Sequence, residues 1–320
     1  MRMKSRAEVD NENTGLTPLY RFWQPQYWGL WLALLLLWAV TLLPFRLQMR
    51  VGQALGRMAM PLMKKRRNIA RVNLRLCFPE LDSAAIETLV GEHFESLGIS
   101  MIETVLAWRI SARRVTQLID MTGLDIPIRE LKQGHAVILL SGHFPAGEVV
   151  GIAVEPALGT LAAMYRPVNN PLADQVVRRA RNRTFAHLVP KDAPRQMLKL
   201  LKQGIPFWYA SDQAYDRKGS ALIPFFGEPA MTSCALTQIA KISRAKVIPF
   251  IPRRKADLSG YEVVFKPPLE NFPTEDAEAD ALRVHQVLEE AIREAPAQYY
   301  WVHRRFKNRP PPHSDPYINL

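Results

Sequence analysis

Short apolar runs alternate with helical patterns in the C-terminal part of this 320-residue chain, and this alternation restricts the fold more than any other feature. The runs have the length of strands and cover residues 136–141, 161–165, 206–210, 246–251 and 261–265. Helical spacing occupies the intervals around 172–186, 193–203, 233–243 and 280–295. Such alternation is typical of a parallel sheet covered by helices on both faces. We therefore expect an α/β fold with a largely parallel central sheet flanked by helices, preceded by a long amphipathic helix from Ser83.

An uncharged, apolar run from Tyr27 to Leu43 precedes this domain. As a helix it would span roughly 26 Å, slightly less than the ~30 Å hydrocarbon core of a bilayer. Four of the seven tryptophans lie in or beside it, as is typical of segments that rest at a membrane interface. We expect an N-terminal hydrophobic membrane-anchor helix over residues 25–45, which either crosses the bilayer or lies in one leaflet. A buried core helix is the alternative, disfavoured because every face is apolar.

The basic residues are concentrated beside the apolar run. The formal net charge is +12, and residues 1–80 carry 13 basic but only 4 acidic side chains. This combination favours an anionic membrane surface over nucleic acid as the partner, and the positive-inside rule places the large C-terminal part in the cytoplasm. We expect five segments: an N-terminal cytoplasmic or interfacial segment (1–24), the anchor (25–45), a basic amphipathic connector (46–82), the main domain (83–309) and a Pro-rich tail (310–320).

One histidine follows the first apolar run and is the strongest candidate for a catalytic group. His143 comes two residues after the run, and Pro145 suits the start of a helix. Glu148 stands five residues after His143, a spacing that converges across a strand–turn–helix junction but not on one helix face. We expect Glu148 to accept a hydrogen bond from one ring nitrogen of His143, leaving the other as a general base. A buried core histidine beside an unrelated carboxylate is the alternative.

Polar residues also follow the second and third apolar runs, at Arg166 and Asp212. Because the carboxyl ends of parallel strands meet at one edge of a sheet, we expect His143, Arg166 and Asp212 to lie together. The other histidines lack such placement and are expected to be structural or surface residues: His93, His135, His187, His285, His303 and His313.

Several other site chemistries have no matching pattern in the sequence. The two cysteines, Cys77 and Cys234, form no CxxC pair, so no disulfide framework is expected. No second His or Cys stands at ligand spacing from His143, which disfavours a metal. Gly-x-Ser-x-Gly, Walker and Gly-x-Gly-x-x-Gly motifs are absent, so neither a serine nucleophile nor a nucleotide cofactor is expected.

Several motifs, taken in order, resemble one family. They are Asn73-Leu74-Arg75-Leu76-Cys77-Phe78-Pro79-Glu80, His143-x4-Glu148, Tyr165-Arg166-Pro167-Val168-Asn169-Asn170-Pro171, Asp212-Gln213-Ala214-Tyr215 with Ile223-Pro224-Phe225-Phe226-Gly227, and the segment from Gln298 to Lys307. With the apolar N-terminal run, they resemble the late acyltransferases of lipid A biosynthesis, the lauroyl/myristoyl transferases within the lysophospholipid acyltransferase superfamily. Glycerolipid relatives there usually carry His-x4-Asp, so Glu148 favours the lipid A branch.

The resemblance implies an acyltransferase that works at a membrane. It implies transfer of a fatty acyl chain from acyl carrier protein to a hydroxyl of a 3-hydroxyacyl chain on a lipid A precursor, a Kdo-linked tetraacyl disaccharide. It places the enzyme at the bacterial inner membrane, with the catalytic domain on the cytoplasmic side. No metal, nucleotide or other cofactor is expected.

Roles are expected for the candidate residues on this basis. His143 takes the proton from the attacking hydroxyl, and Glu148 holds and stabilises its ring. Arg166 is a candidate for contact with the oxyanion or with a lipid phosphate, and a surface salt bridge is the alternative. Asp212 is expected either to orient Arg166 or to contact the acceptor sugar.

The basic C-terminal motif has two interpretations. Arg304, Arg305 and Lys307 either bind phosphate or sugar-acid carboxylate, for which arginine suits bidentate contacts, or form a solvated basic end. Two other functions also remain: a glycerophospholipid or lysolipid acyltransferase with the same His and Glu, and a non-catalytic, membrane-anchored lipid-binding protein.

Overall fold

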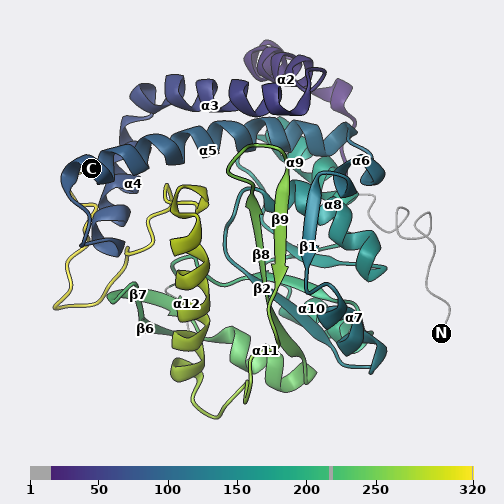
Figure 1. Cartoon of the computed structure of the whole chain (residues 1–320), viewed down its shortest axis with the longest axis vertical. Helices are drawn as coiled ribbons and strands as arrows, with labels where there is room; N and C mark the ends of the chain where they lie inside the picture. Colours follow the sequence, from purple (N-terminus) through teal and green to yellow (C-terminus); the bar gives the residue numbers. More distant parts are fainter. Residues whose placement is uncertain (1–15, 216–218, 319) are drawn as a thin grey trace.

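A seven-stranded sheet lies at the centre of the computed structural model, which describes residues 16–215, 219–318 and 320 (Figure 1). Its strands are β1 (Ile119–Thr122), β2 (Val137–Ser141), β3 (Ala162–Tyr165), β4 (His187–Pro190), β5 (Phe207–Ala210), β8 (Lys246–Arg254) and β9 (Tyr261–Phe265). They follow the order β1-β9-β8-β2-β5-β3-β4, and every neighbouring pair is parallel except β8 with β9. The predicted α/β fold with a largely parallel sheet is confirmed.

Helices and one hairpin complete the fold. The hairpin pairs β6 (Ser220–Phe225) with β7 (Glu228–Ser233) in antiparallel fashion. The α-helices are α2 (Trp28–Val40), α3 (Phe45–Leu62), α4 (Lys64–Cys77), α5 (Ser83–Arg109), α6 (Ala112–Thr116), α7 (Asp125–Lys132), α8 (Gly147–Leu158), α9 (Pro171–Thr184), α10 (Pro194–Lys202), α11 (Ala235–Ser243) and α12 (Ala277–Glu294). Short 3-10 helices are η1 (Leu19–Phe22), η2 (Pro25–Tyr27) and η3 (Pro296–Gln298).

Strand β2 shows why helices cover both faces of the sheet. All five of its residues are buried, and successive side chains point to opposite faces. Val137 and Leu139 pack in one core cluster with residues of α8, whereas Ile138 and Leu140 pack in another with residues of α10 and α11. A strand that is apolar at every position therefore requires a helical layer on each side.

Each of the five predicted apolar runs forms a strand, in chain order β2, β3, β5, β8 and β9. Strands β1, β4, β6 and β7 were not predicted. Strands β1 and β4 form the two edges of the sheet, and each has exposed or partly exposed positions, so neither presents a continuous apolar run. The predicted long helix is α5, which begins at Ser83 because the Asp82 side chain accepts a hydrogen bond from the backbone N–H of Ala85.

The expectation of one membrane-anchor helix over 25–45 is wrong. Helix α2 has 13 residues, about 20 Å of helix, and ends in a turn before α3 begins at Phe45, directly after Pro44. Across the part of the chain that the structure describes, no helix is both long enough and apolar enough to span a membrane. Residues 1–15 of the expected N-terminal segment lie outside the described residues.

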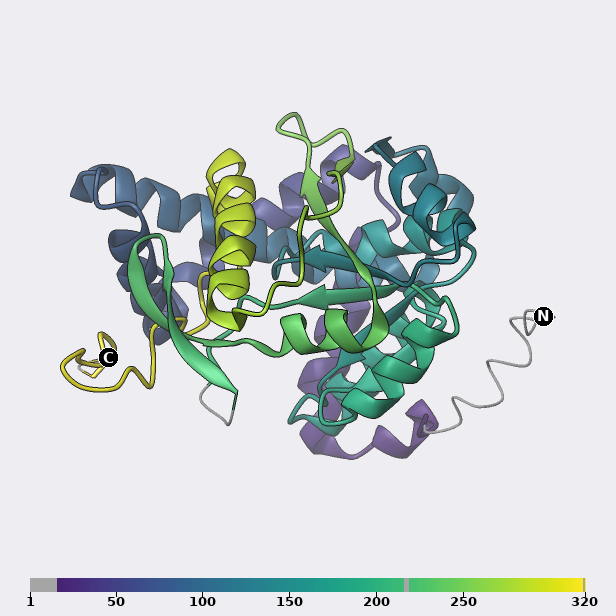
Figure 2. The same cartoon turned by 90° about the horizontal axis from the view of Figure 1, so that it is seen from below.

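Glycines allow α3 to lie directly on α5, so that α5 separates α3 from the sheet (Figures 1 and 2). A Cβ on Gly98 of α5 would lie 2.1 Å from the carbonyl oxygen of Gly52 and 2.4 Å from the nitrogen of Gly56, both in α3. These distances leave no space for a side chain between the two backbones. The close contact buries one face of α3 and leaves the opposite face exposed.

A buried ion pair joins α5 to the sheet. The Arg254 guanidinium of β8 donates hydrogen bonds to both carboxylate oxygens of Glu103 in α5 (2.7 and 2.6 Å) and to the Ser96 hydroxyl (2.6 Å). The Tyr261 hydroxyl donates to Glu103 at 2.9 Å. Both charged side chains are almost inaccessible to solvent, so each depends on the other for its hydrogen bonds.

We expect Glu103→Ala to lower the free energy of unfolding by about 3–5 kcal/mol, because it leaves the Arg254 charge buried without a partner. The measurement is denaturant unfolding of the purified variant. The control is Arg57→Ala, which breaks the exposed Arg57–Glu95 pair and should cost no more than about 1 kcal/mol. Similar losses of unfolding free energy in Glu103→Ala and Arg57→Ala would contradict the inference that the buried Glu103–Arg254 pair stabilises the contact between α5 and the sheet.

Candidate active site

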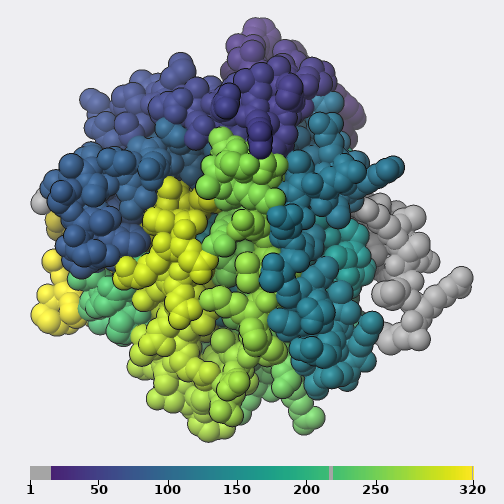
Figure 3. Space-filling model, in the orientation of Figure 1, coloured from purple at the N-terminus to yellow at the C-terminus, as the bar shows by residue number. Residues whose placement is uncertain are grey.

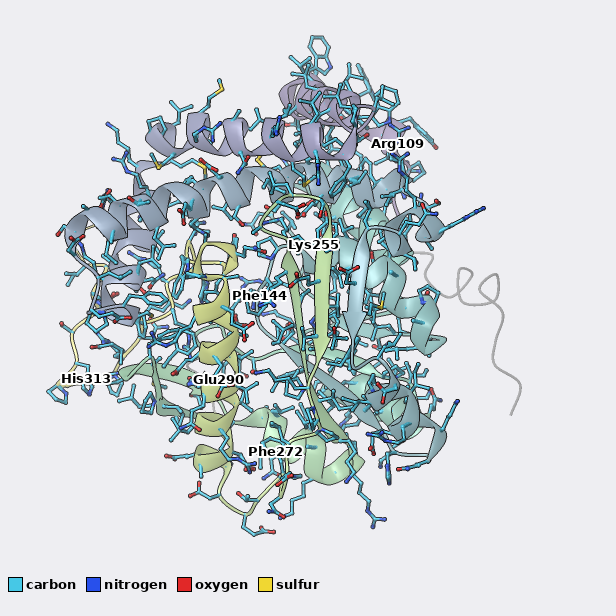
Figure 4. All side chains as sticks on the ribbon, viewed as in Figure 1. Arg109, Phe144, Lys255, Phe272, Glu290 and His313 are labelled. Carbon is cyan, nitrogen blue, oxygen red and sulfur yellow. The ribbon has the colours of Figure 1, made fainter. Side chains whose placement is uncertain are left out.

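The carboxyl ends of β2 and β5 bring the main candidate residues together. These strands are adjacent and parallel, with Ser141 in register with Ala210. His143 and Asp212 each lie two residues beyond this pair, so the strands deliver them to the same edge of the sheet. Phe144, the next residue after His143, lies near the middle of the molecule in the view of Figure 4.

Asp212 fixes the orientation of the His143 ring. The Nδ1–H of His143 donates to Oδ1 of Asp212 at 2.5 Å, and the backbone N–H of His143 donates to Oδ2 at 2.8 Å. The Asp212 side chain is 1% exposed, whereas that of His143 is 38% exposed. An ionised carboxylate only accepts, so the ring carries its proton on Nδ1 and leaves Nε2 available to receive a proton.

The surroundings of Asp212 keep its carboxyl group ionised. Burial by itself raises the pKa of Asp212, but the charge of His143, its hydrogen bonds from the ring and backbone, and a hydrogen bond from Tyr299 outweigh burial. The resulting pKa of Asp212 lies well below its usual range. A buried carboxylate that stays charged at neutral pH can hold the imidazole and stabilise an imidazolium.

The expected contact between Glu148 and His143 is wrong. Glu148 lies in the first turn of α8, and its Oε1 accepts two hydrogen bonds from the Arg181 guanidinium of α9, at 2.8 and 2.6 Å. Asp212 already occupies the ring nitrogen of His143 that Glu148 was expected to meet. The physical reason is that β5, which is adjacent to β2, places the Asp212 carboxylate beside the ring. Glu148 instead pairs with the partly buried guanidinium of Arg181.

Arg166 and the C-terminal arginines lie in three different environments. Arg166 directly follows β3 but is exposed, and Asp212 binds His143 rather than Arg166. Arg304 is partly buried and donates to the carbonyl oxygen of Tyr317 at 3.1 Å, over whose ring it also lies. Arg305 is only 2% exposed, so the interpretation of a solvated basic end is wrong for this residue.

Arg305 places a buried cation in the wall of the site. It donates to the carbonyl oxygen of Met231 (2.9 Å), to the Thr232 hydroxyl (2.7 Å) and toward Nε2 of His285 (3.1 Å). The other ring nitrogen of His285 donates to the carbonyl oxygen of Pro224 at 2.6 Å. His285 is thus held neutral, and burial together with the Arg305 charge lowers its pKa to about 3. Arg305 is held by neutral partners, so its charge adds positive potential to the site.

A small open cleft lies beside His143 and Asp212. The residues that line it come from α4, from the loop after β5 and from the C-terminal segment: Asn73, Gln213, Tyr299, Tyr300, Trp301, His303 and Arg305. Among the described residues, no group of three His, Cys, Asp or Glu side chains is placed to hold a metal ion. The cleft can therefore accept a polar ligand group next to a basic imidazole nitrogen and a buried arginine.

Several residues at this edge of the sheet were not identified as candidates from the sequence. Arg181 shows no local signal, because it is one of several arginines on α9. Asn73, Tyr299 and His303 do belong to the motifs that carried the family resemblance, and those motifs were the available signal. Their assembly required the tertiary fold, since Asn73 and His303 are 230 positions apart.

We expect the protein to lose stability as the pH falls from 7 to 5. Burial lowers the pKa of His93 and of His303 to about 4 and that of His285 to about 3, whereas an unfolded histidine titrates near 6.5. The folded state therefore binds fewer protons, and the stabilisation present above about pH 6.5 declines as the pH drops toward 4. The expected loss is on the order of 1–2 kcal/mol per histidine, measured by denaturant unfolding at both pH values. Equal unfolding free energies would show that these imidazoles are accessible to protons in the folded state.

Comparison with known proteins identifies the family. The sequence profile of bacterial lipid A biosynthesis acyltransferases matches residues 19–308. Two Escherichia coli K12 proteins, a lipid A biosynthesis palmitoleoyltransferase and a lipid A biosynthesis lauroyltransferase, are each 37% identical, over 93% and 89% of this chain and 97% and 94% of their own lengths. A solved structure, the 1-acyl-sn-glycerophosphate acyltransferase PlsC from Thermotoga maritima, matches with a TM-score of 0.37 and 13% identity, over 76% of this chain and 97% of that chain. The chain belongs to the bacterial lipid A biosynthesis acyltransferases and is an acyltransferase.

Proposed function

We propose that this acyltransferase moves a fatty acyl chain from acyl carrier protein to the hydroxyl of a 3-hydroxyacyl chain on a lipid A precursor, the Kdo-linked tetraacyl disaccharide. The observation that carries the proposal is the His143–Asp212 pair at the edge of the cleft, in a chain of this family. It gives the enzyme a general base whose tautomer is fixed before the substrates bind.

The proposed chemical step uses this base and a thioester donor. Nε2 of His143 takes the proton of the acceptor hydroxyl while the hydroxyl oxygen attacks the thioester carbonyl carbon. The tetrahedral oxyanion then collapses, the carbon–sulfur bond breaks, and the imidazolium returns the proton to the leaving thiolate. The products are an ester and a free thiol. Asp212 stabilises the imidazolium between the two proton transfers.

Glu148 and Arg181 have a different proposed role. Their ion pair joins the first turn of α8 to α9, and Arg181 also reaches the carbonyl oxygen of Met164 in β3 at 3.5 Å. Both hydrogen bonds from Arg181 go to Oε1 of Glu148, so Oε2 accepts none from the described residues. We propose that this pair contacts a substrate at the edge of the sheet. Exposed Arg166 and partly buried Arg304 are proposed to meet phosphate or carboxylate groups of the acceptor.

We expect His143→Ala and Asp212→Asn to abolish most of the turnover. Loss of a general base costs about 10²–10⁴-fold, and an asparagine that disturbs the tautomer costs on the order of 10⁴-fold in related hydrogen-bonded sites. The measurement is kcat with acyl carrier protein thioester and lipid A precursor, alongside a melting curve. The control is Asp120→Asn, the same change at a side chain that is 72% exposed.

The Glu148→Gln variant distinguishes the role of Glu148 from that of Asp212. It keeps the shape but weakens the pair with Arg181, so we expect a rise in KM or a smaller fall in kcat than in Asp212→Asn. A loss of kcat in Glu148→Gln equal to that in Asp212→Asn, with unchanged KM, would contradict the division of roles. Wild-type rates in both His143→Ala and Asp212→Asn would remove the proposed base altogether.

Product mass decides between the lipid acceptors. We expect wild-type protein to acylate the lipid A precursor and to leave lysophosphatidic acid unchanged when both are supplied with the same thioester. Acylation of the lysolipid alone would favour a glycerophospholipid acyltransferase. Two relatives with equal identity are named for different acyl chains, palmitoleoyl and lauroyl, so the donors should include several chain lengths.

We also propose that α2 and α3 bind the cytoplasmic face of the inner membrane. Figure 3 shows these helices as an outer layer of the molecule. Large apolar side chains are exposed on or beside them: Tyr20, Trp23, Trp28, Leu32, Leu35, Leu36, Trp38, Leu42, Leu47, Met58, Leu62 and Met63. Exposed basic side chains lie on α3 and in the first turn of α4: Arg46, Arg50, Arg57, Lys64, Lys65 and Arg66. This combination suits the headgroup region of an anionic bilayer.

We expect stronger binding to phosphatidylglycerol vesicles than to phosphatidylcholine vesicles, measured by flotation. A Leu35→Ser/Leu36→Ser variant should bind at least about tenfold more weakly, because each leucine contributes about 1.5–3 kcal/mol when it leaves water. The control is Ile242→Ser, which changes a side chain that is 52% exposed on α11. Equal binding of both variants would argue against a membrane contact through α2.

A further inference from the structure

A second histidine faces the cleft from the C-terminal segment. His303 follows Trp301 in the stretch after η3, and both residues line the cleft together with His143. From the sequence we expected His303 to be structural or a surface residue. The structure instead places two imidazoles that are far apart in the sequence around one opening.

The position of His303 is fixed on two sides. The buried Asn73 side chain of α4 donates to the carbonyl oxygens of Trp301 (2.6 Å) and His303 (2.7 Å). The Tyr317 hydroxyl in turn donates to Oδ1 of Asn73, so the amide cannot rotate without losing its partners. On the ring, Nε2 accepts a hydrogen bond from the backbone N–H of Ala214 at 3.3 Å. Ala214 lies two residues after Asp212.

These contacts decide which nitrogen of His303 carries a proton. Because Nε2 receives a hydrogen bond from a backbone N–H, it cannot itself be protonated, and the proton of the neutral ring lies on Nδ1. Nδ1 has no hydrogen-bond partner among the residues that the structure describes. The ring therefore offers one N–H donor that none of the described residues uses.

The charges around His303 keep the ring neutral. Burial lowers its pKa to about 4, and positive charge on Lys307, on Arg305 and on His143 when that ring is protonated acts in the same direction, while Asp212 opposes it. An imidazole with so low a pKa is a weak base and does not compete with His143 for the proton of the acceptor hydroxyl. It can donate a hydrogen bond to an oxygen that gains negative charge, as preorganised neutral donors do in oxyanion sites.

We propose that His303 is a catalytic residue whose Nδ1–H donates a hydrogen bond to the oxyanion that forms on the thioester carbonyl oxygen. The inference rests on the proposed acyl transfer and extends it, since it supplies the donor that His143 and Asp212 do not provide. Asn73 is the positioning residue that holds the backbone of His303, and Arg305 contributes positive potential from behind the cleft wall.

The test compares four variants of the full-length protein with acyl carrier protein thioester and lipid A precursor. His303→Ala and His303→Phe remove the donor, and Phe keeps a ring of similar size. His303→Asn retains an N–H near the Nδ1 position. His313→Ala is the matched control, because His313 lies at the edge of the molecule, far from Phe144 in Figure 4.

We expect kcat to fall about 10²–10³-fold in His303→Ala and His303→Phe with little change in KM, which is the loss typical of one oxyanion donor. His303→Asn should recover part of kcat, and His313→Ala should match wild type. Wild-type kcat in His303→Phe, or equal losses in the Asn and Phe variants, would overturn the inference. An inactive wild-type protein would instead overturn the proposed function.

Nitrogen-15 NMR of histidine-labelled wild-type protein gives a second measurement that does not depend on variant folding. We expect the His303 ring to be neutral at pH 6, with its proton on Nδ1. A charged ring at pH 6, or a proton on Nε2, would overturn the inference.

Discussion

The parallel pairing of β2 with β5 is the constraint on which the site depends. It sets Ser141 beside Ala210, and the chain then runs two further residues to His143 on one strand and to Asp212 on the other. The same carboxylate binds both the ring and the backbone N–H of His143, so the strand end and the side chain are fixed by one group. An antiparallel pairing, or a shift of one residue, would turn these side chains away from each other. The buried apolar faces of β2 prevent such a shift, because they match helices on both sides.

The charges near the cleft are arranged so that each ionisable group has a defined state. Asp212 stays ionised because its hydrogen bonds and the charge of His143 outweigh burial. The buried Arg305 is held by neutral acceptors, among them a His285 ring that cannot take up a proton at neutral pH. One imidazole beside Asp212 is therefore suited to accept a proton, and the neighbouring imidazole is suited to donate a hydrogen bond.

Close backbone packing and one buried ion pair hold helices α3 and α5 against the sheet. Gly98 allows the backbones of α3 and α5 to touch, and the Glu103–Arg254 pair anchors α5 to β8. The inner face of α3 is thus satisfied within the protein, while its outer face and that of α2 keep apolar side chains in contact with solvent. Exposed apolar surface with adjoining basic residues is the observation that supports the proposed contact with an anionic membrane.

The sequence by itself determined the fold class, because runs such as residues 136–141 are apolar at every position and need cover on both faces. It also determined the family, through motifs that follow one another along the chain, and it predicted His143 as a candidate for the site. It missed the edge strands β1 and β4, which have only four residues each and include polar ones. It predicted one anchor helix from the apolar run and its tryptophans, but α2 ends at Val40 and a second helix begins at Phe45.

The tertiary structure decided which side chains meet. Sequence spacing suggested Glu148 as the partner of His143, but a hydrogen bond depends on distance in space, and β5 brings Asp212 there from 69 residues away. Arg181 binds Glu148 for the same reason, because the two side chains lie close in space. No local sequence pattern reveals how the helix that carries Arg181 is placed beside Glu148. His303 enters the cleft only because Asn73 and Ala214 hold it from two distant elements. Burial and hydrogen bonding, which set protonation states, arise from these long-range contacts, so the sequence could name His143 and Asp212 as candidates but not their contact with each other, nor the place of His303 in the cleft.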